Sequence, residues 1–199
     1  MTARRTAALL LLLTVLTSCA EGGQRATEAA PTPSRTPTAP VTDPTDSAWL
    51  QLMIPMNEQA VILLELAAEK ATGPRLRSWA KGLRDAQALE LTTLRKLRDR
   101  MGLPDTDVHK GHDMPGMVTA EDLEDARTAE GAAFDRLVVT RILDHLRQSE
   151  RVSRSQTAAG SRADAKARAR ALVTARGEQL AVLTALYPGK AADVPEPFA

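Results

Sequence analysis

Two parts of this chain repeat one apolar helical pattern at a constant separation of 89 residues, and this repeat most constrains the fold. Residues 80–94 align without gaps on residues 169–183, and residues 53–57 align on residues 142–146 at the same separation. Within these segments apolar residues recur every three or four positions, which is the spacing of an amphipathic helix. Two helical hairpins of like sequence predict an all-α, up-down four-helix bundle with pseudo-symmetric halves.

Glycine and proline mark the predicted helix ends. Gly73-Pro74, Gly102 with Pro104, Gly160 and Pro188-Gly189 each interrupt the apolar period. We therefore expect a bundle domain over residues 46–187. It divides into a first hairpin (46–102), a loop with a short helix (103–130) and a second hairpin (131–187), and a flexible tail follows (188–199).

A polar layer is expected in the middle of this bundle. Polar residues stand in the inward stripes of two helices, where an uncompensated polar group is costly. The layer consists of Gln87, Glu90, Arg176 and Gln179, and the repeat makes Met56 and His145 equivalent positions beside it.

The N-terminus has the parts of a bacterial export signal. Arg4 and Arg5 precede an apolar run over residues 7–16, and Leu16-Thr17-Ser18-Cys19 resembles a lipobox. Such a signal implies that residues 1–18 are removed and that Cys19, the only cysteine, carries a diacylglycerol. The alternatives are a secreted protein or a single membrane span, but the run is shorter than the roughly 20 residues that a span needs.

Residues 19–45 are rich in proline, threonine and alanine without an apolar period, which predicts a disordered tether. The expected location is therefore extracytoplasmic, on the bacterial cell membrane, and the lipid anchor makes the membrane a partner. A formal net charge of +1 and 3% aromatic residues argue against nucleic acid as a partner. The oligomeric state is left open.

A basic run in the second hairpin has two interpretations. It is either a solvated helix face or a face toward anionic lipid. It contains Arg141, Arg147, Arg151, Arg154, Arg162, Lys166, Arg168 and Arg170.

The loop between the hairpins carries soft and borderline metal ligands within nine positions. They are His109, His112, Met114 and Met117. Imidazole and thioether ligands suit copper or silver ions. The alternative is a polar linker with two incidental histidines.

At these positions the chain resembles the bacterial family catalogued as domain of unknown function 305, over roughly residues 46–186. The matching pieces are Met53-Ile54-Pro55, Gln59-Ala60, Gln87, Glu90, residues 113–117, residues 134–137 and residues 142–145. The resemblance implies a ferritin-like bundle, an exported protein and a metal-binding role, with some members associated with periplasmic copper or silver.

This chain departs from the family pattern at the centre. Met56-Asn57 and His145-Leu146 stand where each half of the family carries His-His, and Arg176 and Gln179 replace Gln and Glu. Two alternatives follow for the core. Either Met53, Met56 and His145 retain a soft metal, or the Arg176 guanidinium pairs with Glu90 and takes the place of the metal charge.

We therefore expect binding rather than catalysis, with no enzyme activity. The first hypothesis is a lipid-anchored protein that binds copper or silver through the loop, with a degenerate central site. The second is a structural or interaction module of the cell envelope, whose partners are envelope proteins and whose core holds a Glu90-Arg176 ion pair.

Overall fold

The computed structural model describes residues 43–189, and these form five α-helices and no strand. The helices are α1 (Pro44–Lys70), α2 (Pro74–Arg100), α3 (Ala120–Thr128), α4 (Gly131–Ala159) and α5 (Ala163–Leu186). The all-α prediction is confirmed. None of these helices is long and apolar enough to cross a membrane. The predicted signal peptide, Cys19, all of the tether before residue 43 and the tail from residue 190 lie outside the described residues.

Helix α1 begins at Pro44, two residues before the predicted start of the domain at residue 46, because Asp43 provides the cap. The Asp43 carboxylate accepts hydrogen bonds from the main-chain N–H groups of Thr45, at 2.9 Å, and Asp46, at 3.2 Å. Pro44 occupies the first turn, where a missing N–H costs nothing. The helix then runs through Pro55 to Lys70 as one element.

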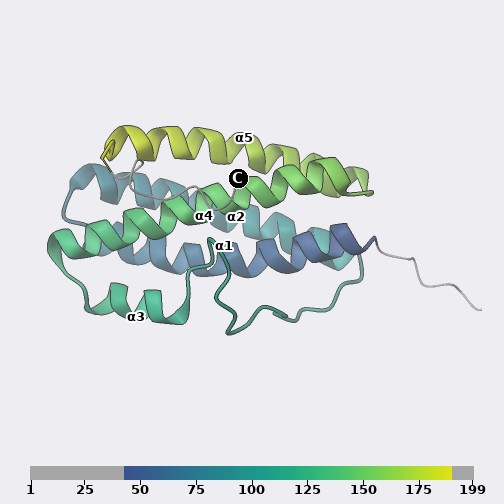
Figure 1. Ribbon diagram of the computed structural model, residues 1–199, viewed down its shortest axis with the longest axis horizontal. Helices are drawn as coiled ribbons and strands as arrows, with labels where there is room; N and C mark the ends of the chain where they lie inside the picture. The colour runs from purple at the N-terminus through teal and green to yellow at the C-terminus, as the bar shows by residue number, and fades with distance from the viewer. Residues whose placement is uncertain (1–42, 190–199) are drawn as a thin grey trace, which may run out of the picture. The chain divides into compact units, whose positions relative to one another are not determined.

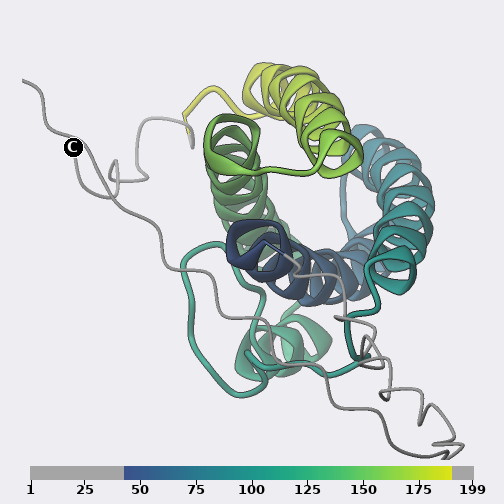
Figure 2. The same ribbon diagram turned by 90° about the vertical axis from the view of Figure 1, so that its right-hand side faces the viewer.

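The four long helices pack side by side as a bundle (Figures 1 and 2). Helix α1 contacts α2 and α4, and α5 contacts α4 and α2. The short α3 lies outside them against α1 and α4. The long connection from α2 to α3 therefore has to return along the outer side of α1 and α4.

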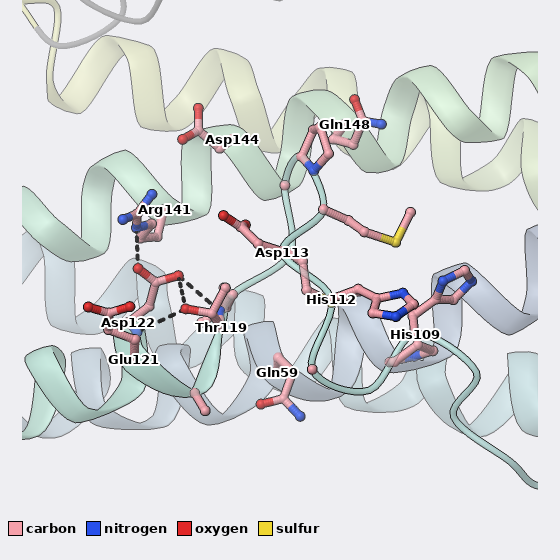
Figure 3. Close-up of a pocket in the computed structure, with 18 of the residues that line it drawn as sticks. Gln59, His109, His112, Asp113, Thr119, Glu121, Asp122, Arg141, Asp144 and Gln148 are labelled. Carbon is pink, nitrogen blue, oxygen red and sulfur yellow. Dashed lines mark hydrogen bonds and ion pairs between the residues drawn. The ribbon is translucent and has the colours of Figure 1, made fainter.

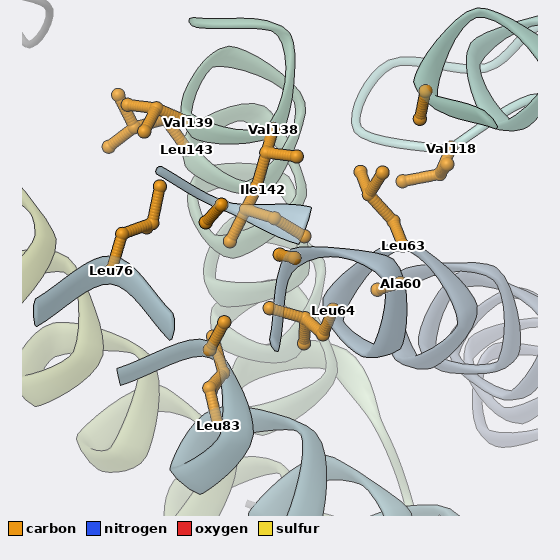
Figure 4. Packing of buried hydrophobic residues seen from close by; sticks show 14 of the residues in the cluster. Ala60, Leu63, Leu64, Leu76, Leu83, Val118, Val138, Val139, Ile142 and Leu143 are labelled. Carbon is orange, nitrogen blue, oxygen red and sulfur yellow. The ribbon is translucent and has the colours of Figure 1, made fainter. Parts of the chain in front are cut away.

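The apolar core consists of two clusters. One contains Leu63, Leu64, Leu76 and Ile142 and is closed on one side by Val118 and α3 (Figure 4). The other, at the opposite end, contains Trp49, Leu50, Met53, Met56, Leu94, Leu97, Met101 and Leu172. Along α1, α2 and α5 the fully buried residues between these two clusters are polar, namely Asn57, Gln87 and Arg176, so the apolar core is interrupted midway.

Asp46 joins the start of α1 to the turn between α4 and α5. Its carboxylate is completely buried and accepts the main-chain N–H groups of Arg162, at 2.9 Å, and Ser161, at 3.3 Å. The Gln156 side-chain amide also donates to it. A Cβ on Gly160 would lie 2.7 Å from this carboxylate, so the turn passes too close for any other residue.

We expect Asp46→Ala to lower the free energy of unfolding by about 2–3 kcal/mol, because it strands the buried Gln156 amide and two main-chain donors. Urea denaturation followed by circular dichroism measures the change. Asp85→Ala, on an exposed carboxylate, is the control and should leave the midpoint unchanged. Equal denaturation midpoints for both variants would mean that the Asp46 contacts do not stabilise the fold.

Candidate functional site

The Arg176 side chain is the largest fully buried side chain in the described part of the protein. Its guanidinium holds Glu90 with two parallel bonds, from Nη2 to Oε2 at 2.7 Å and from Nη1 to Oε1 at 3.1 Å. The Glu90 side chain is 12% exposed and that of Arg176 is fully covered. A bidentate pair of this kind is the strongest hydrogen-bonding arrangement that a carboxylate and an arginine can form.

The other guanidinium donors reach three more side chains. Nε donates to Oγ of Ser149 at 2.8 Å, Nη1 to Oε1 of Gln179 at 2.9 Å, and Nη2 to Oδ1 of Asn57 at 3.2 Å. With Glu90 on α2, Asn57 on α1, Ser149 on α4 and Arg176 itself on α5, one side chain bonds to all four long helices. This layer lies between the two apolar clusters.

Three polar side chains of the layer keep buried atoms without hydrogen-bond partners. These atoms are both ring nitrogens of His145, both amide atoms of Gln87 and Nδ2 of Asn57. Burial and, to a smaller extent, the nearby Arg176 charge lower the pKa of His145 to about 3, and the main chain of Gly116 opposes this shift. His145 is therefore a neutral imidazole at physiological pH, the form that binds metals.

The core residues do not fit a carboxylate-bound metal pair. Such sites need several inward carboxylates and two histidines. Here Glu90 is already paired with a permanent cation, and Met53 and Met56 are buried within an apolar cluster. Among residues 43–189, no three histidine, cysteine, aspartate or glutamate side chains gather as a metal-binding group.

The loop after α2 forms two consecutive hydrogen-bonded turns, each with a ligand pair at its ends. The N–H of His112 bonds to the carbonyl of His109, and the N–H of Met117 to the carbonyl of Met114, both at 2.9 Å. The third residue of each turn is a glycine with positive φ, 79° at Gly111 and 75° at Gly116. This matches a type II turn, in which the first and fourth Cα atoms lie within about 7 Å.

An open pocket of about 870 Å³ lies between this loop and the bundle (Figure 3). His109 and His112 lie close together at one end of it, and Asp122, Thr119 and Arg141 lie at the other. There Asp122 accepts from Thr119 in the capping box of α3 and pairs with Arg141 at 2.6 Å. These contacts fix the point at which the loop enters α3.

Gly116 brings the loop onto α4 beside His145. A Cβ at Gly116 would lie 2.9 Å from the carbonyl oxygen of Asp144 and would clash with Cβ of Gln148. Asp144 and Gln148 flank His145 on the same helix, and the Gly116 main chain is close enough to influence the imidazole. The structure therefore brings Gly116, which lies between Met114 and Met117 in the loop, next to the predicted core histidine, and the repeat did not indicate this contact.

The predicted site residues differ in accessibility. His112 is exposed and His109 and Met114 are half-buried, whereas Met117 packs against the cluster that contains Met53 and Met56. Asn57 and Ser149 also belong to the polar layer, although they were not among its predicted residues. Ser149 stands four residues after His145, on the same helix face, and this spacing was a usable signal.

The sequence of this chain matches one protein family. The sequence profile described as "Domain of unknown function (DUF305)" matches residues 45–187. No curated protein sequence matches the chain.

Solved structures of low sequence identity have the same fold. A DUF305 protein from Streptomyces coelicolor has a TM-score of 0.65 at 18% identity, covering 78% of this chain and 98% of that one. A DUF305 fragment from Deinococcus radiodurans has a TM-score of 0.65 at 16% identity, with coverages of 73% and 96%. CopM in its Cu(II)-bound form has a TM-score of 0.63 at 19% identity, with coverages of 72% and 95%.

We expect Arg176→Ala to lower the free energy of unfolding by about 3–5 kcal/mol, because Glu90 is left as a buried, unpaired charge. The double variant Arg176→Met with Glu90→Met should recover part of that loss, since it removes both charges. Urea denaturation of both variants measures this. An unchanged midpoint for Arg176→Ala would contradict a stabilising role for the pair.

The stability of the protein should fall as the pH is lowered from about 6.5 towards 3. In this range the unfolded chain protonates His145, with its ordinary pKa of 6.5, whereas the folded state does not until the pH is about 3. The slope from this group approaches about 1.4 kcal/mol per pH unit. His145→Leu should remove that component, measured by urea denaturation across the range; an identical slope in the variant would contradict a neutral, buried imidazole.

Proposed function

The chain belongs to the DUF305 family, and from this we propose that it is a lipid-anchored, extracytoplasmic protein that binds copper or silver ions through its loop. The observation that carries the proposal is the pair of consecutive turns, in which main-chain hydrogen bonds join His112 to His109 and Met117 to Met114. Two imidazoles and two thioethers form a soft ligand set. The function is binding rather than catalysis.

We further propose that the bundle is ferritin-like and built from two pseudo-symmetric hairpins. Helices α1 and α4 end at Lys70 and Ala159, and α2 and α5 begin at Pro74 and Ala163, so both pairs stand 89 positions apart. Helix α1 packs against α2, and α4 against α5. These equivalences support a duplicated hairpin.

In this arrangement the central layer is a former metal site that Arg176 has closed. The repeat pairs Met56 with His145 and Gln87 with Arg176, and all four side chains are fully buried. A guanidinium that is satisfied by Glu90 supplies a positive charge inside the bundle without a metal. A soft core site at Met53, Met56 and His145 is the competing assignment, and it would have to tolerate this neighbouring cation.

Two observations support copper at the loop in particular. CopM, whose fold this chain shares, has been solved in Cu(II)-bound and Cu(I)-bound forms. In this chain the loop is accessible from the pocket, and the neutral His145 lies beneath Gly116. The loop therefore has ligands for both oxidation states, with imidazole for Cu(II) and thioether for Cu(I).

A second candidate function is a structural or interaction module of the cell envelope that binds no metal. The Arg176 layer favours it, because a core closed by an ion pair needs no metal to fold. In that case the two turns of the loop serve only to carry the chain from α2 to α3.

Metal titration tests the proposal. Full-length chain carrying Cys19→Ser, which removes the only thiol, should bind Ag(I) by isothermal calorimetry and Cu(I) by competition with a chromogenic chelator. The variant with His109→Ala, His112→Ala, Met114→Leu and Met117→Leu should lose at least tenfold in affinity, since all four proposed ligands are removed.

The matched control carries Met53→Leu, Met56→Leu and His145→Leu. Loss of binding in this variant, with the loop variant unaffected, would move the site into the core. If the parent chain binds neither ion, metal binding is wrong and the envelope module is favoured.

A further inference from the structure

The end of the bundle where α1 begins also contains the end of α2 and the turn between α4 and α5 (Figure 1). Asp43 accepts a hydrogen bond from the Ser161 hydroxyl at 2.6 Å, and Asp46 accepts from the N–H of Arg162. Arg100, the last residue of α2, lies 3.6 Å from Asp164 on the first turn of α5. Three segments distant in sequence thus form one surface, here called the entry end.

The entry end is rich in cations. Basic residues in the last turns of α2 and α4, in the α4–α5 turn and in the first turns of α5 include Lys96, Arg98, Arg100, Arg154, Arg162, Lys166 and Arg170. Four of them have acidic partners: Arg98 pairs with Asp99 and Asp105, Arg154 with Glu150, and Arg100 and Arg162 share Asp164. Lys96, Lys166 and Arg170 have no carboxylate within salt-bridge distance in the part of the chain that the structure describes.

The acidic groups nearest the chain's entry are engaged with the protein itself. Asp46 is buried under the α4–α5 turn, and Asp43 is bound to Ser161 and to the first N–H groups of α1. The exposed carboxylates Asp99 and Asp105 are bound to Arg98. The groups left to act on an external partner at this end are therefore cationic.

We propose that the entry end docks on the anionic phospholipid headgroups of the membrane that carries the protein. The inference rests on the lipid-anchor part of the proposed function and adds the surface that faces the bilayer. Cys19 stands 24 positions before Asp43, and at about 3.6 Å per residue the start of α1 stays within roughly 90 Å of the lipid.

Because the lipid anchor keeps the domain near the membrane, a weak affinity of the entry end for lipid headgroups is enough to orient it. A tethered domain meets the bilayer at a high effective concentration, so a few unpaired cations can orient it. Lysine and arginine near an anionic surface each add a modest, salt-sensitive attraction. Lys96, Lys166 and Arg170 come from two different helices, which favours a broad surface such as a bilayer.

Vesicle co-sedimentation tests the surface separately from the anchor. The mature chain from residue 19, with Cys19→Ser so that it cannot be lipidated, should bind vesicles of mixed phosphatidylglycerol and phosphatidylcholine and not vesicles of phosphatidylcholine alone. Binding should disappear at ~0.5 M salt, where the screening length falls to a few ångströms.

The variant Lys96→Glu, Lys166→Glu, Arg170→Glu should lose more than tenfold in partitioning. The matched control Arg75→Glu, Lys81→Glu, Arg136→Glu makes the same change in net charge on exposed cations near the other end of α2 and the start of α4, and should lose less than about threefold. Circular dichroism verifies that both variants fold.

No preference of the Cys19→Ser chain for anionic vesicles, or equal losses of vesicle binding in the two variants, would overturn the docking surface.

Mass spectrometry of the membrane-bound protein tests the anchor itself. An unmodified Cys19 with intact vesicle binding would reject the anchor and keep the surface. The variant Lys96→Glu, Lys166→Glu, Arg170→Glu should bind metal ions as the parent chain does. Metal titration and vesicle binding therefore test the two proposals separately.

Discussion

The Arg176 guanidinium is the interaction on which the rest of the core depends. A buried arginine is tolerated only when its donors find acceptors, and here these come from all four long helices, with Glu90 supplying the compensating charge. The helices must therefore keep one register around this layer. The layer also divides the apolar side chains into two clusters, because leucine and methionine cannot occupy the level that the polar groups take.

This constraint shapes what the protein can bind. A metal ion in the central layer would compete with the Arg176 guanidinium for Glu90, so the core has no free carboxylate ligand for a cation in this layer. The loop has no such obstacle, since its two turns present imidazoles and thioethers at the edge of an open pocket. Sharing a fold with copper-bound CopM at 19% identity does not transfer a ligand set. Each ligand has to be argued on this chain's own residues.

The loop and the layer are adjacent, and this links the two parts of the molecule. Gly116 packs between Asp144 and Gln148, directly over the helix that carries His145. The imidazole beneath it is neutral and fully buried. The charge of Arg176 acts on the same imidazole, so the loop, His145 and the polar layer lie next to one another.

The sequence by itself determined the helices, most of their ends and the level of the polar layer, because these follow from local period and from glycine and proline chemistry. Pro115-Gly116 also has the residue types that a type II turn favours at its two central positions. Only the tertiary structure decided which groups Arg176 reaches, why Asp46 is buried, and that Gly116 lies on α4 beside His145. These contacts join residues up to 119 positions apart. They depend on how far side chains reach between packed helices, and periodicity along one helix contains no such information.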